Sequence, residues 1–387
     1  MSQDTSIYAL RGVVQHYAWG GQEFIPHLLG TTNENDQPHA EYWIGTHSKG
    51  PAQIKVNGEW KSLATLTKLP YLLKILDVEA MLSIQSHPNK QQAEIGFNRE
   101  NTAGIPLDAA HRVFRDDNHK PELMVALSDF WLLHGFRPLE NINEWVQAMP
   151  AFRNAFTEEI NDIKAFYTQI MRMSEAEQVA ILSDLKQDLC QVDTADKDLP
   201  HYWASKAFDD YSMDSGIFSI YFFNLVHLNE GEAIYQEAGI PHAYLEGQNI
   251  EIMANSDNVF RAGLTPKHID IDLLLAHLSF DPVVPKVISP QPSAKYELRY
   301  PSPATEFEIR IIDLAAGEFL KLESFSSECY FMLRGQVKIE SEADDLLIQK
   351  GESFYMSKAI QIQLTALTDT RLVRAITPSE PAEIQPI

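Results

Sequence analysis

The sequence predicts a mainly β fold, with a discontinuous jelly roll or sandwich, a helical insert and a second β domain at the carboxyl-terminal end. Short β-rich runs broken by Pro and Gly fill residues 1–138 and 216–285. Between them, residues 139–215 carry apolar side chains at helical spacing. Residues 286–387 alternate strand-like stretches with glycine turns. A chain of 387 residues with 44% hydrophobic content is long enough for two or three domains.

Strands in the first part are predicted from short runs such as Pro51–Val56 and Leu123–Leu127. The segment Leu72–Ile84 is strongly apolar but encloses charged residues, Lys74 among them. That combination is typical of adjacent buried strands beside a functional site. After the insert, the apolar run Phe218–Val226 is predicted to be a strand that leads to a turn at Gly231.

The insert is predicted to be helical because its apolar residues recur three and four positions apart. Residues 142–149 and 156–170 both follow this period. Ser174 and Glu177 form a capping box ahead of a third apolar stripe, over residues 179–189. These stripes are interpreted as core faces of helices. In the last block, Gly317, Gly335 and Gly351 separate alternating stretches, which favours a sandwich or jelly roll.

Charge and cysteine content restrict the possible partners. The formal net charge of −23 opposes binding to nucleic acid and to acidic lipid. A site for an anionic substrate would therefore have to gather its own positive charge. Cys190 and Cys329 are too far apart in sequence to resemble a disulfide framework, which indicates a reducing compartment. The start of the chain, with Asp4, does not resemble a secretory signal, and no apolar run is long enough for a membrane span. A soluble, cytoplasmic protein is expected.

Three segments offer metal ligands. In the first, Gln85 and His87 are two positions apart, so on a strand they share a face, together with Ser83. In the second, Lys120 and Glu122 flank Pro121, which favours an extended backbone and places Glu122 at the mouth of an apolar strand. Alone, the first pattern is better explained as a hydrogen-bonded polar pair and the second as an ordinary charged loop.

The third segment is Gly239-Ile240-Pro241-His242. A glycine that permits a turn, followed by a histidine that points inward, has the shape of a metal loop of the cupin type. A lone histidine here is more often a satisfied core residue. Together, however, Gln85, His87, Glu122 and His242 supply an amide oxygen, two imidazoles and a carboxylate. This mixed set of nitrogen and oxygen ligands suits a borderline divalent ion such as zinc.

Seven ordered motifs between Tyr17 and Asp270 closely resemble the type I mannose-6-phosphate isomerases. They are Tyr17-Ala18-Trp19-Gly20, the stretches Ala40–His47 and Leu82–Lys90, Asn118-His119-Lys120-Pro121-Glu122, Gly135-Phe136-Arg137-Pro138, Pro241-His242-Ala243-Tyr244, and Met253–Val259 continuing through Arg261 to Lys267. The block after Asp270 matches less sharply. The resemblance therefore covers most of the first 270 residues.

The resemblance implies a zinc enzyme on a cupin scaffold that interconverts D-mannose 6-phosphate and D-fructose 6-phosphate. It implies a catalytic cupin domain formed by residues 1–138 and 216–285, a helical insert at 139–215, and a cupin-like β domain at 286–387. The last domain is predicted to bind no metal. One Zn²⁺ per chain is implied, with a small sugar phosphate as the partner, a monomeric state and a place in GDP-mannose biosynthesis.

The resemblance also assigns residues to roles. The metal ligands fall on Gln85, His87, Glu122 and His242. The catalytic arginine falls on Arg261 and an acidic residue on Glu251. Phosphate contacts fall on Lys74, Ser83 and Lys267.

The base that moves the proton stays open among Glu251, His119 and Lys120, since a carboxylate or a lysine could serve if its pKa were shifted. Two alternatives to an isomerase also stay open, a metallocupin oxygenase and a non-catalytic metallocupin that binds sugar phosphates.

Overall fold

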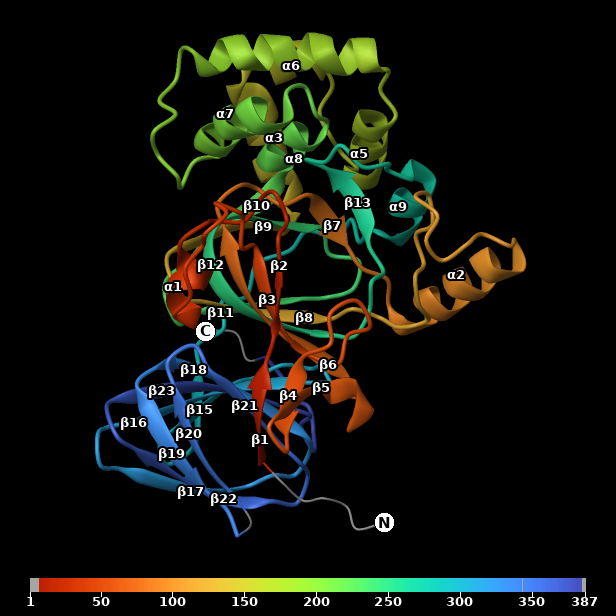
Figure 1. Ribbon diagram of the computed structural model, residues 1–387. Coiled ribbons are helices and arrows are strands. Elements are labelled where there is room, and N and C mark those ends of the chain that lie inside the picture. Colours follow the sequence, from red (N-terminus) through yellow and green to blue (C-terminus); the bar gives the residue numbers. More distant parts are fainter. Residues whose placement is uncertain (1–6, 343, 385–387) are drawn as a thin grey trace.

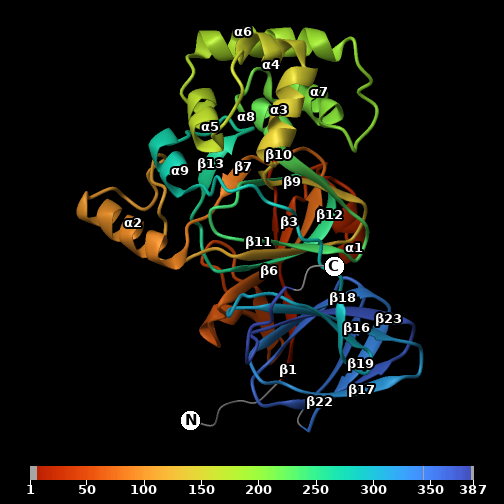
Figure 2. The same ribbon diagram turned by 180° about the vertical axis from the view of Figure 1, so that it is seen from behind.

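The computed structural model describes residues 7–342 and 344–384 of the chain. A helical layer, a central curved sheet and a second β domain follow one another along the molecule (Figures 1 and 2). The predicted mainly β fold with a helical layer is confirmed. Among the described residues no helix combines the length and the apolar character that a bilayer crossing requires. Met1–Ser6, which contain Asp4, lie outside the described residues.

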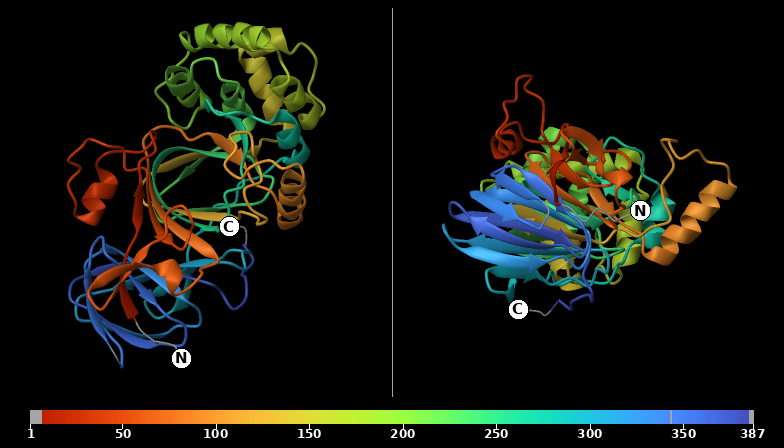
Figure 3. Two further views of the ribbon diagram at one scale, coloured as in Figure 1. Left: turned by 45° about the vertical axis from the view of Figure 1, so that its right-hand side comes forward. Right: turned by 60° about the horizontal axis from the view of Figure 1, so that its bottom comes forward.

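The central sheet is built from strands that precede the helical layer in the sequence and strands that follow it. Its strands are β2 (Val13–Gln15), β3 (Glu41–Gly45), β6 (Tyr71–Val78), β7 (Ile84–Ser86), β8 (Glu122–Ala126), β9 (Phe130–Phe136), β10 (Phe223–Leu228), β11 (Ala233–Gln236), β12 (His242–Ala254) and β13 (Phe260–Gly263). Around it lie η1 (Leu63–Thr65), α1 (Phe24–Leu29), α2 (Lys90–Thr102) and α9 (Ile271–His277). Helix α2 projects from the side of the sheet (Figure 3, right).

Strand β12 joins the two halves of this sheet. Its second half, from Gly247 to Ala254, pairs with β6 and β8, whereas its first half pairs with β9 and β7. The register shifts between Tyr244 and Glu246, and Gly247 then has a φ of 124°. A Cβ at Gly247 would stand 2.6 Å from the carbonyl oxygen of Asp129, so only glycine fits this bend. β12 can therefore place side chains beside both halves of the central sheet.

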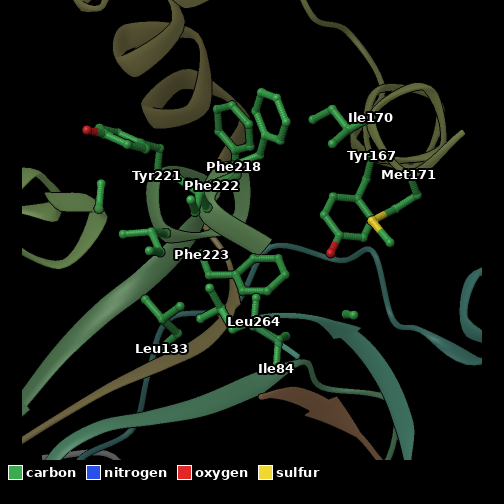
Figure 4. Packing of buried hydrophobic residues seen from close by; sticks show 14 of the residues in the cluster. Ile84, Leu133, Tyr167, Ile170, Met171, Phe218, Tyr221, Phe222, Phe223 and Leu264 are labelled. Atoms are coloured by element: carbon green, nitrogen blue, oxygen red, sulfur yellow. The ribbon is translucent and has the colours of Figure 1, made fainter. Parts of the chain in front are cut away.

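The helical layer covers one end of the central sheet. It comprises α3 (Leu139–Ala148), α4 (Pro150–Ala155), α5 (Ile163–Met171), α6 (Glu175–Leu189), α7 (Pro200–Tyr211) and α8 (Gly216–Phe222). The capping box predicted at Ser174 and Glu177 is present at the start of α6. The period predicted over 156–170 becomes helical only from Ile163, where Asp162 caps α5. Phe218, Tyr167 and Leu264 belong to one continuous core that ties the helices to the sheet (Figure 4).

The strand predicted over Phe218–Val226 is wrong in its first half. Residues 216–222 form α8, and β10 begins only at Phe223. The side chain of Asp214 accepts a hydrogen bond from the backbone N–H of Gly216 at 2.7 Å, which favours a helix start. Every residue of α8 is buried, so large apolar side chains surround the helix and Ser219 alone does not give it a helical period.

The carboxyl-terminal domain is a sandwich of two antiparallel sheets. Its strands are β14 (Gln291–Ala294), β15 (Glu297–Tyr300), β16 (Glu308–Leu314), β17 (Phe319–Glu323), β18 (Glu328–Arg334), β19 (Gln336–Glu340), β20 (Asp345–Gln349), β21 (Ser353–Met356), β22 (Gln361–Ala366) and β23 (Thr370–Ile376). One sheet has the order β17-β22-β19-β20. It encloses a core with the larger sheet, to which Tyr330, Val337 and Leu364 contribute.

The larger sheet also takes strands from the start of the chain. β1 (Ile7–Arg11), β4 (Gln53–Val56) and β5 (Glu59–Ser62) extend it beyond β21 (Figure 1). Residues 7–11 and 53–62 therefore pair with the carboxyl-terminal domain, whereas the sequence assigned them to the catalytic domain. The other predicted domain boundaries, at 138/139, 215/216 and 285/286, stay a prediction. Local patterns reveal a strand but not the distant strand that it pairs with.

A shared apolar core fixes the two β domains against each other. Leu73, Leu123 and Ile250 of the central sheet belong to the same buried cluster as Phe307 and Val373 of the carboxyl-terminal domain. The hydroxyl of Tyr71 adds a hydrogen bond of 2.8 Å to the carbonyl oxygen of Ala375. The outer face of the central sheet is thus buried by its neighbour rather than exposed to water.

A buried arginine organises the carboxyl-terminal domain. Arg374 donates two hydrogen bonds to Glu328, at 2.9 and 3.0 Å, and one to Glu297 at 2.7 Å. Glu297 also accepts from Arg310 at 2.9 Å. Burial would raise the pKa of Glu297, but Arg374 and Arg310 outweigh it and hold that pKa below its usual value. Both carboxylates depend on the guanidinium of Arg374 because water cannot reach them.

We predict that Arg374→Met lowers the free energy of unfolding by about 3–5 kcal/mol at pH 7, since buried Glu328 loses its cation and Glu297 keeps only Arg310. The pKa of folded Glu297 lies below its unfolded value, so the contribution of this pair is complete above pH ~4.3 and lost as the pH falls. The cost of the substitution should therefore shrink at pH 4. Urea unfolding at both pH values measures it, with the exposed Lys338→Met as control. An equal cost at both pH values would contradict the account.

Candidate active site

Two imidazoles and a carboxylate from separate strands meet inside the central sheet. His87 directly follows β7, Glu122 opens β8 and His242 opens β12, and all three are buried. Glu122 Oε2 lies 3.6 Å from His87 Nε2 and 3.3 Å from His242 Nε2. When metal–ligand bonds measure ~2.1 Å, tetrahedral ligand atoms stand about 3.4 Å apart. The spacing therefore suits one small divalent ion.

Both imidazoles are oriented by the backbone. His87 Nδ1 lies 2.8 Å from the carbonyl oxygen of Asn258, and His242 Nδ1 lies 3.1 Å from that of Ile240. An N–H at each Nδ1 leaves the Nε2 lone pair free for a metal. His87 Nε2 is buried without a hydrogen-bond partner among the described residues. Burial and the ammonium of Lys120 lower the pKa of His87 to about 4, so the ring is neutral at pH 7.

Glu122 is held as a carboxylate. Its Oε1 lies 2.7 Å from the ammonium of Lys120, and its Oε2 faces the two imidazoles. Burial would raise the pKa of Glu122, but Lys120 and the imidazoles outweigh it and hold the pKa well below its usual value. One oxygen is therefore fixed by a cation and the other is presented as a metal ligand.

Gln85 lies beside this triad through strand pairing. β7 runs between β12 and β13, so Gln85 is in register with His242 on one side and with Arg261 on the other. Its side chain lines the same cavity as Glu122 and His242. This position is compatible with a fourth ligand from the amide oxygen, and that role stays a prediction.

A cavity of about 660 Å³ opens beside the triad. Most of the residues singled out in the sequence line it: Lys74, Ser83, Gln85, Lys120, Glu122, His242, Glu251, Arg261 and Lys267. His87 lies behind the wall, with 1% of its surface exposed. His119 is not among the lining residues, because its ring turns toward Glu306 of the carboxyl-terminal domain.

Comparisons with known proteins agree with this geometry. A family model described as phosphomannose isomerase type I, catalytic domain, matches residues 7–139. The mannose-6-phosphate isomerase of Salmonella typhimurium is 35% identical over 367 residues, which cover 89% of this chain and 93% of that protein. The human mannose-6-phosphate isomerase is 31% identical, covering 95% of this chain and 98% of the human protein. The chain belongs to the type I phosphomannose isomerase family.

Solved structures of the family have the same fold. A zinc-bound mannose 6-phosphate isomerase superposes with a TM-score of 0.86 at 34% identity, over 96% of this chain and 99% of that chain. A Salmonella typhimurium structure bound to its substrate fructose 6-phosphate and to zinc gives the same values. The likeness spans the carboxyl-terminal domain as well as the region that the family model matches.

The predicted phosphate ligand Lys74 is already paired in this family member. Its ammonium lies 2.7 Å from Glu251 and 3.8 Å from Glu41, and all three residues are buried. Burial would lower the pKa of Lys74, but the two carboxylates outweigh it and raise the pKa above its usual value. The other oxygen of Glu251 accepts a hydrogen bond of 2.8 Å from the hydroxyl of Tyr244. Lys74 is thus a permanent cation with two anionic partners, and a phosphate contact there stays a prediction.

Three other cations of the cavity have no carboxylate partner among the described residues. Arg261 and Lys267 make no side-chain hydrogen bond or ion pair in this part of the chain, and Arg115 donates only to the carbonyls of Leu107 and Ala109. Burial and Arg115 lower the pKa of Arg261, while burial, Arg261 and Lys49 lower that of Lys267. Arg261 therefore lies close enough to Arg115 and to Lys267 to be repelled by both, so an anion beside them would be stabilised.

The sequence did not identify Arg115 as a cation of the cavity or Asn258 as a residue that holds the loop before Glu122. The side chain of Asn258 accepts from the backbone N–H of Arg115 at 2.6 Å and donates to the carbonyl of Asn118 at 2.8 Å. It thereby fixes the loop ahead of Glu122, while its own carbonyl orients His87. Nothing local distinguishes Arg115 from a surface cation. Asn258 lies in a recognised motif, which was the available signal.

We predict that His242→Ala lowers the metal content of the purified chain strongly, because one of three buried ligand atoms disappears. His134 is its cross-strand neighbour, but the Nδ1 of His134 lies 2.8 Å from Gln236 Oε1 and His134 lies outside the triad. His134→Gln is therefore the matched control and should keep the metal. Elemental analysis of both variants tests the assignment. A loss of metal in His134→Gln with retention in His242→Ala would refute it.

Proposed function

We propose that this chain is a zinc-dependent aldose–ketose isomerase that interconverts D-mannose 6-phosphate and D-fructose 6-phosphate. One observation carries the proposal: the His87–Glu122–His242 triad and three uncompensated cations share a single cavity in the described part of the chain. Cations that crowd together without carboxylate partners repel one another, and an anion bound between them removes that repulsion. A phosphorylated sugar can offer its hydroxyls to one side of the cavity and its phosphate to the other.

Gln85, His87, Glu122 and His242 would hold the zinc. The neutral imidazole of His87, the ionised carboxylate of Glu122 and a buried Nε2 that lacks a partner within the described chain fit an ion that prefers nitrogen and oxygen ligands. When bound, zinc supplies a Lewis acid that can polarise and orient the oxygens of the sugar. One ion per chain follows from the one triad among the described residues.

The phosphate would lie beside Arg115 and Lys267, which leaves the neighbouring Arg261 for the reacting end of the sugar. Guanidinium and ammonium groups form charge-assisted hydrogen bonds with phosphate oxygens, and arginine can do so with two donors at once. Ser83 lines the same cavity and can add a hydroxyl. A dianion there would relieve the repulsion that lowers the pKa of Arg261 and Lys267.

The reaction moves a proton between C2 and C1 through an enediol. A base removes the proton from C2 of the aldose while the carbonyl oxygen O1 takes up a proton, which gives the enediol. The same C2 proton or one from solvent is then added to C1 while the O2 hydroxyl loses its proton and becomes the carbonyl of the ketose. Arg261 can stabilise the negative oxygen of the enediolate, since its guanidinium is charged and has free donors. Lys120 and Glu251 line the cavity and remain candidates for the base, whereas His119 would have to act from outside its wall.

An isomerase assay with and without a chelator tests the proposal. Purified chain should convert mannose 6-phosphate into fructose 6-phosphate, lose this activity with its zinc, and regain it when zinc is returned. Binding of the sugar phosphate without conversion would favour the non-catalytic alternative. Oxygen consumption without isomerisation would favour an oxygenase.

The cellular location, oligomeric state and pathway of the enzyme are also part of the proposal. The two cysteines, Cys190 and Cys329, are both free thiols, which supports a reducing, cytoplasmic location. We propose a monomer that supplies GDP-mannose biosynthesis, without nucleic-acid or membrane partners. The acidic charge supports the last point.

Substitutions in the cation cluster should separate binding from chemistry. We predict that Arg115→Ala and Lys267→Ala each raise the KM for mannose 6-phosphate by about tenfold, because each removes one charged contact with the phosphate. Arg261→Ala should instead lower kcat by about 100-fold or more, since it loses a contact made to the developing charge. Steady-state kinetics measures both, with zinc content checked in each variant. An unchanged KM in Arg115→Ala would remove that residue from the phosphate site.

A further inference from the structure

The segment that leads into the metal carboxylate is held from two sides. On the side of the catalytic domain, Asn258 Nδ2 donates to the carbonyl of Asn118 at 2.8 Å. On the opposite side, His119 Nε2 lies 2.5 Å from Glu306 Oε1 of the carboxyl-terminal domain. Lys120 and Pro121 are all that separate this contact from Glu122. Because Pro121 limits the backbone at Lys120, movement of His119 would be passed on to the metal ligand.

Glu306 is itself firmly placed in its own domain. It directly precedes Phe307, which is fully buried, and β16. The hydroxyl of Thr377 donates to the carbonyl of Glu306, and that of Thr305 donates to Glu306 Oε2, both at 3.2 Å. The hydrogen bond from His119 lowers the pKa of Glu306, which keeps the side chain ionised at neutral pH. The carboxylate is therefore a fixed point to which His119 can be attached.

The strand that carries Glu122 rests on the same domain. Leu123 and Val125 face away from the metal triad and share a buried cluster with Phe307 and Val373. The start of β8 is thus fastened by a polar contact at His119, and its body by apolar packing. The ladders with β11 and β12 fix the register of β8, so the contact at His119 acts on the loop ahead of the strand, where Lys120 and the entry to Glu122 lie.

We propose that Glu306 is a positioning residue of the active site, through which the carboxyl-terminal domain sets the place of Lys120 and Glu122. This inference rests on the proposed function. It gives the second β domain a part in catalysis although no metal is predicted there. Glu306 acts on the site through His119 and touches neither metal nor sugar.

Three substitutions of Glu306 test its role. Glu306→Ala removes the acceptor, Glu306→Asp withdraws it by one methylene, and Glu306→Gln keeps an acceptor oxygen at the same reach. Glu340→Ala is the matched control, because Glu340 pairs with Lys338 on the surface of the same domain. Zinc release to a chromogenic chelator, kcat and KM would be measured for each, together with thermal unfolding.

We expect Glu306→Ala and Glu306→Asp to release zinc about tenfold faster and to lose about tenfold in kcat, as is usual when a partner behind a metal ligand is removed. KM should change less than about twofold because the cation cluster is untouched. Glu306→Gln should recover most of both losses. The double variant His119→Ala/Glu306→Ala should be no worse than His119→Ala alone, since both act through one contact.

Zinc release and kcat of Glu306→Ala within about twofold of the parent would overturn the inference. So would additive losses in the double variant, or equal losses in Glu306→Ala and Glu306→Gln. The unsubstituted chain separates this failure from a failure of the proposed function. If the unsubstituted chain binds zinc but does not isomerise mannose 6-phosphate, the zinc-release arm still tests the role of Glu306.

Discussion

The buried carboxylate of Glu122 is the constraint on which the rest of the site depends. An anion away from water must be compensated, and here Lys120 compensates one oxygen while the other faces two imidazoles. This arrangement explains why each imidazole is oriented by a backbone carbonyl at Nδ1, and why the Nε2 of His87 is buried with no partner in the described chain. A divalent cation completes such a site, because it satisfies the carboxylate oxygen and both lone pairs at once.

The fold brings these groups together through one long strand. β12 pairs with both halves of the central sheet, so it carries His242 to the triad and Glu251 to the buried Lys74. The neighbouring β7 places Gln85 between His242 and Arg261. His242, Gln85 and Arg261 are therefore parts of one hydrogen-bonded sheet, whereas Arg115 and Lys267 reach the cavity from loops. The carboxyl-terminal sandwich supports this sheet from outside through a shared apolar core.

Sequence patterns predicted the fold class, the capping box at Ser174 and a metal triad made from His87, Glu122 and His242. The metal ligands had local signals: Gln85 and His87 are two positions apart on a strand, and Pro121 precedes Glu122. Pairing between distant segments was not predictable, so the union of β1 with the carboxyl-terminal sheet and the contact between His119 and Glu306 were missed. Composition alone could not show that Lys74 is neutralised whereas Arg115 is not, since that depends on which carboxylates fold beside them. The mostly apolar run at α8 led to a wrong strand prediction because a helix that is buried on all sides shows no alternation of apolar and polar faces.

The most direct test of the central claim is anomalous diffraction at the zinc edge from crystals of the purified chain soaked with fructose 6-phosphate. The account predicts one zinc peak within bonding distance of His87 Nε2, Glu122 Oε2 and His242 Nε2, with the phosphate beside Arg115 and Lys267. A zinc peak elsewhere, or a sugar phosphate bound away from these cations, would contradict it.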